Sequence, residues 1–526
     1  MSRETRLFLF LVLWLGIVLA FIWLFPTDRR INTSQVQTNT NQVVSELTNR
    51  LVNLNVKPFE ELIDTNNIKL TVRERGVKSI YFSYESREYE LSSSNYVLMP
   101  FSVVLDSILF ITNIFLEPIL FEKNGISRVE KDGLKYVITR EIIPVSNYVF
   151  DIVIKVKNEY SRPIVFNGFS LVFSGPLGPD TSDEQHTYFA LRTGYVDKSS
   201  NIVETLTTSI FTGTERFAVK EEVLGVWMEN RYTVVGIVTT NDRFRSEFVV
   251  RDTKYGYNKV MSLRSPSEIL KEKSEKVYTF RVLVGPRKNE ILHSFGYGFS
   301  GLEDGGILRP IYDFLKFLMK LLFGIAGNWG VAIILLSVVI KLLLEPLSIK
   351  AAVSMKRFQL IAPKIKEIQE KYKSDPKKMN AEIAELYKVY GANPASGCLP
   401  LLLQIPIFIA LYNVLSGFIE LKEQGLLWIN DLTKPDTVLY IKALEGTFIL
   451  PASINLLPII MTAFSLLQTY ITSSKAQTQQ TVVMWILPVV FMFIFWNLPS
   501  ALVLYWTIQT ILSIVEQYVI NKVIKY

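Results

Sequence analysis

The residues of this chain with the clearest chemical potential are two charged side chains inside an apolar helix-forming segment. Residues 331–346 read VAIILLSVVIKLLLEP, a nearly unbroken apolar run that carries Lys341 and, one helical turn later, Glu345. A lysine at the centre of a membrane-spanning helix costs roughly 2.5–3.5 kcal/mol, so it is retained where the helix faces protein or water. The segment therefore predicts a polar site inside a membrane protein.

Polar side chains also recur in the other apolar segments of the C-terminal half. They are Ser337, Gln404, Gln468, Gln509, Ser513 and Glu516. Ser337 lies four residues before Lys341 and shares its helical face, and the last three members form one stripe on a single helix. Their alignment predicts helices that face a shared polar space. Hydrogen bonding between helices explains each glutamine nearly as well.

The composition supports a membrane protein and excludes several classes of site. Of the 526 residues, 49% are hydrophobic and 20% are charged, and the net charge is +7. The positive residues cluster in particular loops, so we expect no nucleic-acid specificity. Cys398 is the single cysteine and there are two histidines, which disfavours a disulfide, a zinc site and a haem site. The sequence lacks GxxxxGK(S/T), HExxH and GxSxG patterns, and we expect neither an enzyme nor a cofactor.

The N-terminal segment 7–25 contains 19 residues without a charge and follows Arg3 and Arg6. A cleaved signal peptide is one interpretation. The apolar stretch is longer than a typical signal-peptide core, and the following Trp-Leu-Phe-Pro offers no small-residue cleavage site. We therefore expect residues 1–27 to be an uncleaved membrane anchor.

Residues 28–300 have the pattern of a β domain outside the membrane. Apolar residues alternate at period two in several runs, which include Ile80, Phe82 and Tyr84; Phe150, Ile152, Ile154 and Val156; and Tyr278, Phe280, Val282 and Val284. Runs of this kind separated by Gly, Asn, Asp and Pro predict an antiparallel sandwich. Segment 101–121 is apolar enough to suggest a span, but charges interrupt it, and its longest uncharged run of about 10 residues suits a buried core better.

Residues 301–326 are predicted to hold an amphipathic helix in the membrane interface, centred on 307–324. Its charged face carries Arg309, Asp313, Lys316 and Lys320. Its apolar face carries Ile311, Phe314, Leu315, Leu318 and Leu322. An ordinary helix packed on the β domain is the alternative.

Five further spans follow, which gives six in total. They are 329–345, 397–419, 456–472, 482–496 and 501–520, of which the third and fourth are short for a bilayer. Loop 348–396 holds ten Lys and Arg residues, whereas 417–453 on the opposite side holds three. The positive-inside rule then places the first loop and both termini in the cytoplasm, and the β domain outside.

The basic loop 348–396 is predicted to fold as two charged amphipathic helices, 356–372 and 377–390, joined around Ser374-Asp375-Pro376. Its candidate contact residues are Lys356, Arg357, Lys364, Lys366, Lys377 and Lys378. A solvated connector is the alternative. The tail 521–526 is short and basic.

Several motifs, in order along the chain, resemble one family. They are FRVLVGP at 280–286, NWG at 328–330, GCLPLLLQIPIF at 397–408 and LPSALVLYW at 498–506. The C-terminal half resembles the YidC family of membrane protein insertases, in the bacterial form with a large periplasmic domain. The resemblance implies a periplasmic β-supersandwich and a five-span core at 327–520 in the bacterial inner membrane.

The resemblance also implies an activity and partners. Nascent membrane proteins would enter through a polar groove that is open to the cytoplasm and to lipid, either alone or beside the Sec translocon. The basic hairpin would meet clients, the ribosome or signal-recognition machinery, and lipid headgroups. Lys341 stands where the family has arginine, which keeps the charge and loses the five-donor fork.

Two interpretations of Lys341 follow. In the first it attracts acidic client segments. In the second it is neutralised by Glu345 or extends to the cytoplasmic interface. Other functions for the whole chain are a secondary transporter or channel, which predicts an internal repeat that we do not find, and a carbohydrate-binding protein based on the β domain.

Overall fold

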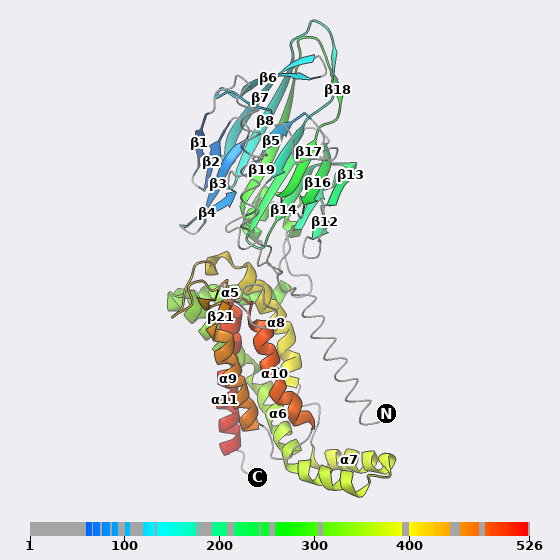
Figure 1. Ribbon diagram of the computed structural model, residues 1–526, viewed down its shortest axis with the longest axis vertical. Helices are drawn as coiled ribbons and strands as arrows, with labels where there is room; N and C mark the ends of the chain where they lie inside the picture. The colour runs from blue at the N-terminus through cyan, green and yellow to red at the C-terminus, as the bar shows by residue number, and fades with distance from the viewer. Residues whose placement is uncertain are drawn as a thin grey trace. The chain divides into compact units, whose positions relative to one another are not determined.

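The computed structural model describes residues 59–523 except 66, 74–75, 85–86, 93–99, 106–118, 132–133, 175–176, 178–191, 208–214, 241–243, 252–257, 303–308, 392–398, 442–452 and 473–478. The chain divides into two compact units, Met1–Glu303 and Asp304–Tyr526. The first is rich in strands and the second is helical, which confirms the predicted mixed fold class at this level (Figure 1). The expected anchor 7–25 and the centre of segment 101–121 lie outside the described residues.

Two antiparallel sheets form most of the β unit. The larger has the spatial order β12 (Ile202–Thr207), β11 (Arg192–Val196), β14 (Gly225–Glu229), β15 (Thr233–Thr239), β19 (Glu275–Pro286), β8 (Val149–Asn158), β7 (Leu134–Ser146) and β6 (Ile126–Lys131). The smaller has the order β13 (Glu215–Val223), β16 (Phe244–Arg251), β17 (Asn258–Arg264), β10 (Ser170–Ser174) and β5 (Ser102–Val104).

Shorter elements complete the described part of this unit. A four-stranded sheet has the order β1 (Glu61–Asp64), β2 (Ile68–Val72), β3 (Val77–Tyr84) and β4 (Arg87–Ser92). Strand β9 (Ile164–Phe166) pairs with β18 (Glu268–Leu270). After β19 come the helix α4 (Asn289–Phe295) and the 3-10 helix η3 (Phe299–Leu302).

The apolar core lies between the two larger sheets. Phe244 of β16 contacts Phe280 of β19 edge-on with ring centroids 5.0 Å apart. Phe169, beside β10, contacts Tyr278 in the same way at 5.1 Å. The period-two residues of β8 and β19 are buried, so the predicted strand pattern is confirmed there. Both described ends of segment 101–121 are also buried in this unit.

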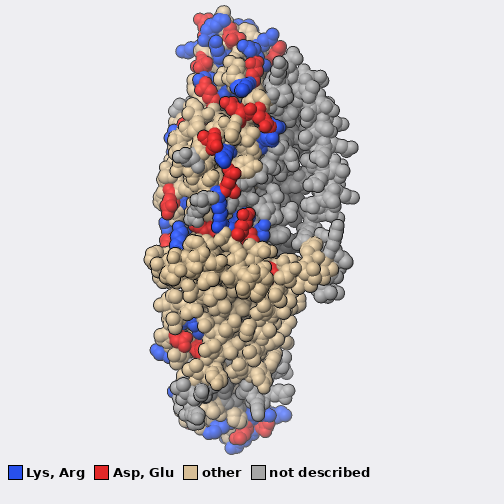
Figure 2. Space-filling model, turned by 90° about the vertical axis from the view of Figure 1, so that its left-hand side faces the viewer, with Lys and Arg blue, Asp and Glu red and all other residues tan. Residues whose placement is uncertain are grey.

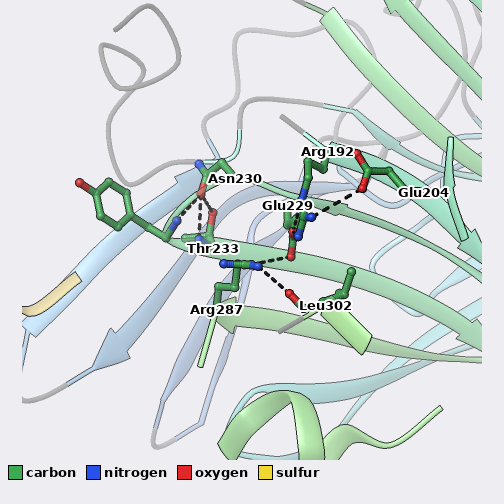
Figure 3. Close-up of polar contacts among 8 residues, drawn as sticks. Arg192, Glu204, Glu229, Asn230, Thr233, Arg287 and Leu302 are labelled. Carbon is green, nitrogen blue, oxygen red and sulfur yellow. Dashed lines mark hydrogen bonds and ion pairs between the residues drawn. The ribbon is translucent and has the colours of Figure 1, made fainter. Parts of the chain in front are cut away.

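A buried acid joins three elements of the β unit (Figure 3). The Glu229 side chain, 1% exposed, accepts hydrogen bonds from Arg192 Nε at 2.7 Å and Arg287 Nε at 2.8 Å. Arg287 also donates to the carbonyl of Leu302 at 2.5 Å. A buried carboxylate is tolerated when it is paired and hydrogen-bonded. Glu229 therefore joins β14 to β11 and to Arg287 directly after β19, and Arg287 extends the network to η3. The sequence does not predict these contacts.

The Glu229 cluster predicts an asymmetry between two acids that share one arginine. Glu229→Ala removes the buried partner of two arginines and should destabilise the β unit by about 3–5 kcal/mol. Glu204→Ala removes the half-exposed partner that lies 3.6 Å from Arg192 and should cost less than about 1 kcal/mol. Thermal unfolding of the full chain, followed by the β-sheet circular dichroism signal, measures both. Equal losses would contradict the assigned role of burial.

The helical unit is a bundle with two outlying helices. Its members are α5 (Arg309–Ala326), α6 (Trp329–Lys371), α7 (Pro376–Tyr390), α8 (Leu399–Gly417), α9 (Leu456–Thr472), α10 (Gln479–Phe495) and α11 (Ser500–Val523). A 3-10 helix, η6 (Ile419–Leu421), and the pair β20 (Thr437–Tyr440) and β21 (Ser453–Asn455) lie in the connection between α8 and α9. Helix α11 packs against α6 and α9, while α5 crosses one end of the bundle and α7 lies at the other (Figure 1).

Helix α6 differs from the prediction because one continuous helix of 43 residues replaces a span and a separate helix that begins at Lys356. Pro346 and Pro363 lie inside it without ending it. The helix begins where Asn328 caps the Val331 N–H. The following α7 begins after Asp375, which caps Lys377 and Lys378, in agreement with the predicted turn.

Helix α5 forms within the predicted segment, but its apolar surface is divided. Tyr312, Leu315, Leu318, Met319 and Leu322 are buried, and the Tyr312 hydroxyl accepts a hydrogen bond from Asn413 of α8 at 3.0 Å. Phe314, Phe317, Leu321 and Ile325 are exposed instead. The predicted apolar face is therefore divided in the structure, because Leu315, Leu318 and Leu322 pack on protein whereas Phe314 is exposed. The position of this helix in the membrane interface stays a prediction.

The described helices differ in their capacity to cross a bilayer. One segment, Trp329–Lys350, is long and apolar enough by itself, while Gln404–Gly417, Leu456–Ile471 and Trp485–Phe495 are shorter apolar helices. On the face that Figure 2 shows, the surface of the helical unit is largely uncharged, and charged side chains gather toward the end that carries α7. The count of six spans therefore stays a prediction.

Candidate functional site

The polar centre of the helical unit joins α6 to α11. Lys341 Nζ lies 2.5 Å from Glu516 Oε2 and 3.0 Å from Ser513 Oγ. The Lys341 and Glu516 side chains are only 12% and 10% exposed. The structure thus brings Lys341 together with two other predicted site residues that lie 172 and 175 positions away in the sequence.

Two further hydrogen bonds extend this contact along α11. Gln509 Nε2 donates to the Ser337 carbonyl at 2.8 Å, and Gln404 Nε2 of α8 donates to the Tyr505 hydroxyl at 2.8 Å. Tyr505 was not among the predicted site residues, although it lies four residues before Gln509 on the same face of the helix. The stripe on α11 is therefore a series of links to α6 and α8. For Gln404 and Gln509 the structure shows the interhelical hydrogen bonds that were the alternative interpretation.

The remaining predicted groove residues are less directly connected. The Ser337 side chain is fully buried, and its hydroxyl donates to the Ile333 carbonyl within α6 at 2.8 Å. Gln468 lies half-buried on α9. Glu345 is half-buried and close enough to Glu516 and Lys341 to interact with both electrostatically. The ion pair that the structure gives Lys341 is with Glu516 and not with Glu345.

The basic hairpin is held by a small apolar core. Ile361 and Ile365 of α6 are buried against Ile383, Leu386 and Tyr387 of α7. Most of the predicted contact residues lie at its surface, since Arg357, Lys364, Lys366, Lys377 and Lys378 are all exposed. Lys364 contacts the Tyr390 ring, and Lys378 lies over the Tyr372 ring at 5.3 Å. The side chain of Lys356 lies outside the described residues.

The sequence of this chain is similar to that of proteins with a known description. Residues 321–526 match the model of a family described as "60Kd inner membrane protein". A membrane protein insertase YidC from Syntrophobacter fumaroxidans is 34% identical over 382 residues, which cover 72% of this chain and 66% of the relative. The chain belongs to the YidC family of membrane protein insertases. The polar contacts between α6, α8 and α11 lie within the residues that match this family model.

Two more relatives carry the same description. The YidC insertase from Treponema denticola is 37% identical over 268 residues, covering 47% of this chain and 45% of the relative. The one from Campylobacter jejuni is 40% identical over 246 residues, covering 46% and 43%. The matches thus span between about two fifths and two thirds of the relatives' own lengths.

The geometry predicts strong coupling between Lys341 and Glu516. In a double-mutant cycle with Lys341→Met and Glu516→Gln, each single change leaves an unmatched group between α6 and α11, and the double change removes both. We expect a coupling energy of about 1–3 kcal/mol from thermal unfolding in detergent. The matched cycle with Glu345→Gln should give a smaller value. Additivity of Lys341 and Glu516 within about 0.5 kcal/mol would contradict the pair.

Proposed function

We propose that this protein inserts and folds membrane proteins in a bacterial inner membrane. The observation that carries the proposal is the line of polar groups, Gln404 to Glu516, inside an apolar helical bundle of a YidC-family chain. A client's polar flank must cross hydrocarbon, and polar side chains on neighbouring helices lower that cost. Burial of the client's apolar segment in lipid, at about 25 cal/mol per Å², supplies the driving free energy without nucleotide hydrolysis.

The proposed topology has six spans, with the anchor 1–27 as the first and α6, α8, α9, α10 and α11 as the rest. Residues 28–300 form a periplasmic β-supersandwich, and 301–326 lie in the membrane interface. The exposed apolar stripe of α5 supports the interfacial position, because Phe317 and Ile325 need a cover other than water. The positive-inside rule then sets the orientation of the core 327–520. It places the hairpin 348–396, the tail 521–526 and both termini in the cytoplasm.

The proposed groove residues are Lys341, Ser337, Glu345, Gln404, Gln468, Gln509, Ser513 and Glu516. The hydrogen bonds of Ser337 support a positioning role. Its hydroxyl donates to a carbonyl within α6, and its own carbonyl accepts a hydrogen bond from Gln509. The proposed contact surface for nascent clients, the ribosome or signal-recognition machinery, and acidic lipid lies on the basic hairpin. It consists of Lys356, Arg357, Lys364, Lys366, Lys377 and Lys378. The Sec translocon is a proposed partner.

A reconstitution experiment tests the function. The purified full chain in lipid vesicles should insert a single-span client added as it is synthesised, as measured by protection of its translocated flank from protease. A variant with Lys341→Met and Gln404→Leu and Gln509→Leu should lose most of this insertion, because the polar path is removed. Vesicles without protein provide the baseline.

The same vesicles separate an insertase from a transporter or channel. A solute-conducting protein would release trapped ions or small solutes and leave client protection at the baseline. That pattern would contradict the proposal.

The β unit should be separable from the insertion step. No polar residue of the α6–α11 contact belongs to it, so deletion of 32–274 should leave at least about a third of the insertion rate. The measurement is the same protection assay with matched amounts of folded protein. Complete loss of insertion in a variant whose helices remain folded would show that the β unit takes part in insertion.

A further inference from the structure

We propose that the polar centre between α6 and α11 selects clients by accepting hydrogen-bond donors and positive charge, and not by attracting acidic segments. The residue that sets this preference is Glu516. The inference rests on the proposed insertase function and specifies the chemistry of the client segment that this site receives.

The first observation is that the positive charge of Lys341 is already matched. Its ammonium group lies 2.5 Å from Glu516 Oε2 and 3.0 Å from Ser513 Oγ, in a setting where both charged side chains are about nine-tenths buried. Charges at this distance in a region of low dielectric constant hold each other strongly. An acidic client group would have to displace Glu516 before it could bind Lys341.

The second observation is the sign of the net charge on the cluster of Lys341, Glu345 and Glu516. Glu345 lies one helical turn after Lys341 and interacts electrostatically with both Lys341 and Glu516. One ionised lysine and two ionised glutamates give the cluster a formal charge of −1. An approaching carboxylate therefore meets two like charges and no unpaired cation, which disfavours its binding.

The third observation is an unused acceptor. Glu516 Oε1 is buried and has no hydrogen-bond partner in the described part of the chain, while Oε2 is occupied by Lys341. Buried carboxylate oxygens in proteins are almost always hydrogen-bonded, and a missing donor is costly. A lysine, an arginine or a backbone N–H of an unfolded client flank supplies that donor without breaking the pair with Lys341.

Glu516 and Lys341 are therefore arranged as a compensated pair in which one carboxylate oxygen, Glu516 Oε1, has no hydrogen bond within the described part of the chain. A groove that held a free cation at this place would recruit acids. This one offers a carboxylate oxygen on α11, beside the polar stripe that continues through Ser513 and Gln509.

The test uses three clients that differ only in the translocated flank, which carries two Lys, two Gln or two Asp residues. The full-length protein is reconstituted in vesicles of neutral lipid without a membrane potential, so neither the bilayer charge nor an applied field sorts the clients. We expect the Lys client to insert about fivefold faster than the Asp client, a ratio that corresponds to about 1 kcal/mol. Equal rates, or a faster Asp client, would overturn the inference.

Two variants identify the residue responsible. Glu516→Gln keeps the shape and frees Lys341, so the order should reverse in favour of the Asp client. Glu423→Gln removes the same charge from an exposed loop position and should leave the order of the wild type unchanged. An unchanged order in a folded Glu516→Gln protein would overturn the role of Glu516.

Insertion of the Gln client separates this inference from the proposed function. If no client inserts with the wild-type protein, the insertase proposal fails. If the Gln client inserts and charge has no effect, only the selectivity fails. If Glu516→Gln does not fold, Glu345→Gln serves as the second variant and should lower the ratio of the insertion rates of the Lys and Asp clients. An unaltered ratio would contradict the role assigned to the net negative charge of the cluster.

Discussion

The helical unit depends on one constraint, which is that a lysine in an apolar helix requires a partner. Lys341 is nearly buried in α6, and neither lipid nor apolar side chains can replace the water that its ammonium group has lost. Glu516 supplies that partner from α11. The pair constrains both the position of α11 along the axis of α6 and the rotation of each helix about its own axis. The bonds from Gln509 to the Ser337 carbonyl and from Gln404 to Tyr505 repeat the same constraint toward the other end of the bundle.

This constraint also bears on the part of α6 that extends beyond the bundle. The helix that carries Lys341 continues without a break to Lys371, where it turns into α7. Its apolar contacts with α7 hold the basic hairpin to the same helix that carries the polar centre. The basic hairpin is therefore an extension of the helix that carries Lys341, and a contact made at the hairpin is made on the same helix as the polar centre.

Much of the fold was predictable from periodicity and charge. The alternation in β8 and β19 identified strands because a half-buried strand must alternate, and the apolar runs near 456–472 identified α9 with its observed bounds. The continuity of α6 was not predictable, because prolines such as Pro346 and Pro363 usually mark helix boundaries, whereas in the structure the helix continues through both. Which apolar residues of α5 pack on protein and which are exposed was not predictable either, because two adjacent apolar stripes have the same period.

Part of the candidate site was also accessible from sequence, but its pairing was not. The polar residues within apolar segments were visible, and i, i+4 spacing placed Gln509, Ser513 and Glu516 on one stripe. Sequence proximity favoured Glu345 as the neighbour of Lys341, whereas the structure pairs it with Glu516, 175 residues away. Spacing along a helix describes which groups share a face, and the packing of α11 on α6 decides which faces meet.

The central claim is that clients pass the polar stripe of α11 on their way into lipid. Site-specific photo-crosslinking tests it directly, with a photoreactive residue at position 513 beside the polar centre and a control at 325 on the exposed apolar face of α5. With a ribosome-arrested client in native membranes, the account predicts that position 513 crosslinks to the client's first apolar segment while that segment is inserting, and that position 325 does not. Crosslinks to lipid or to no client at position 513, with client crosslinks at 325, would contradict it.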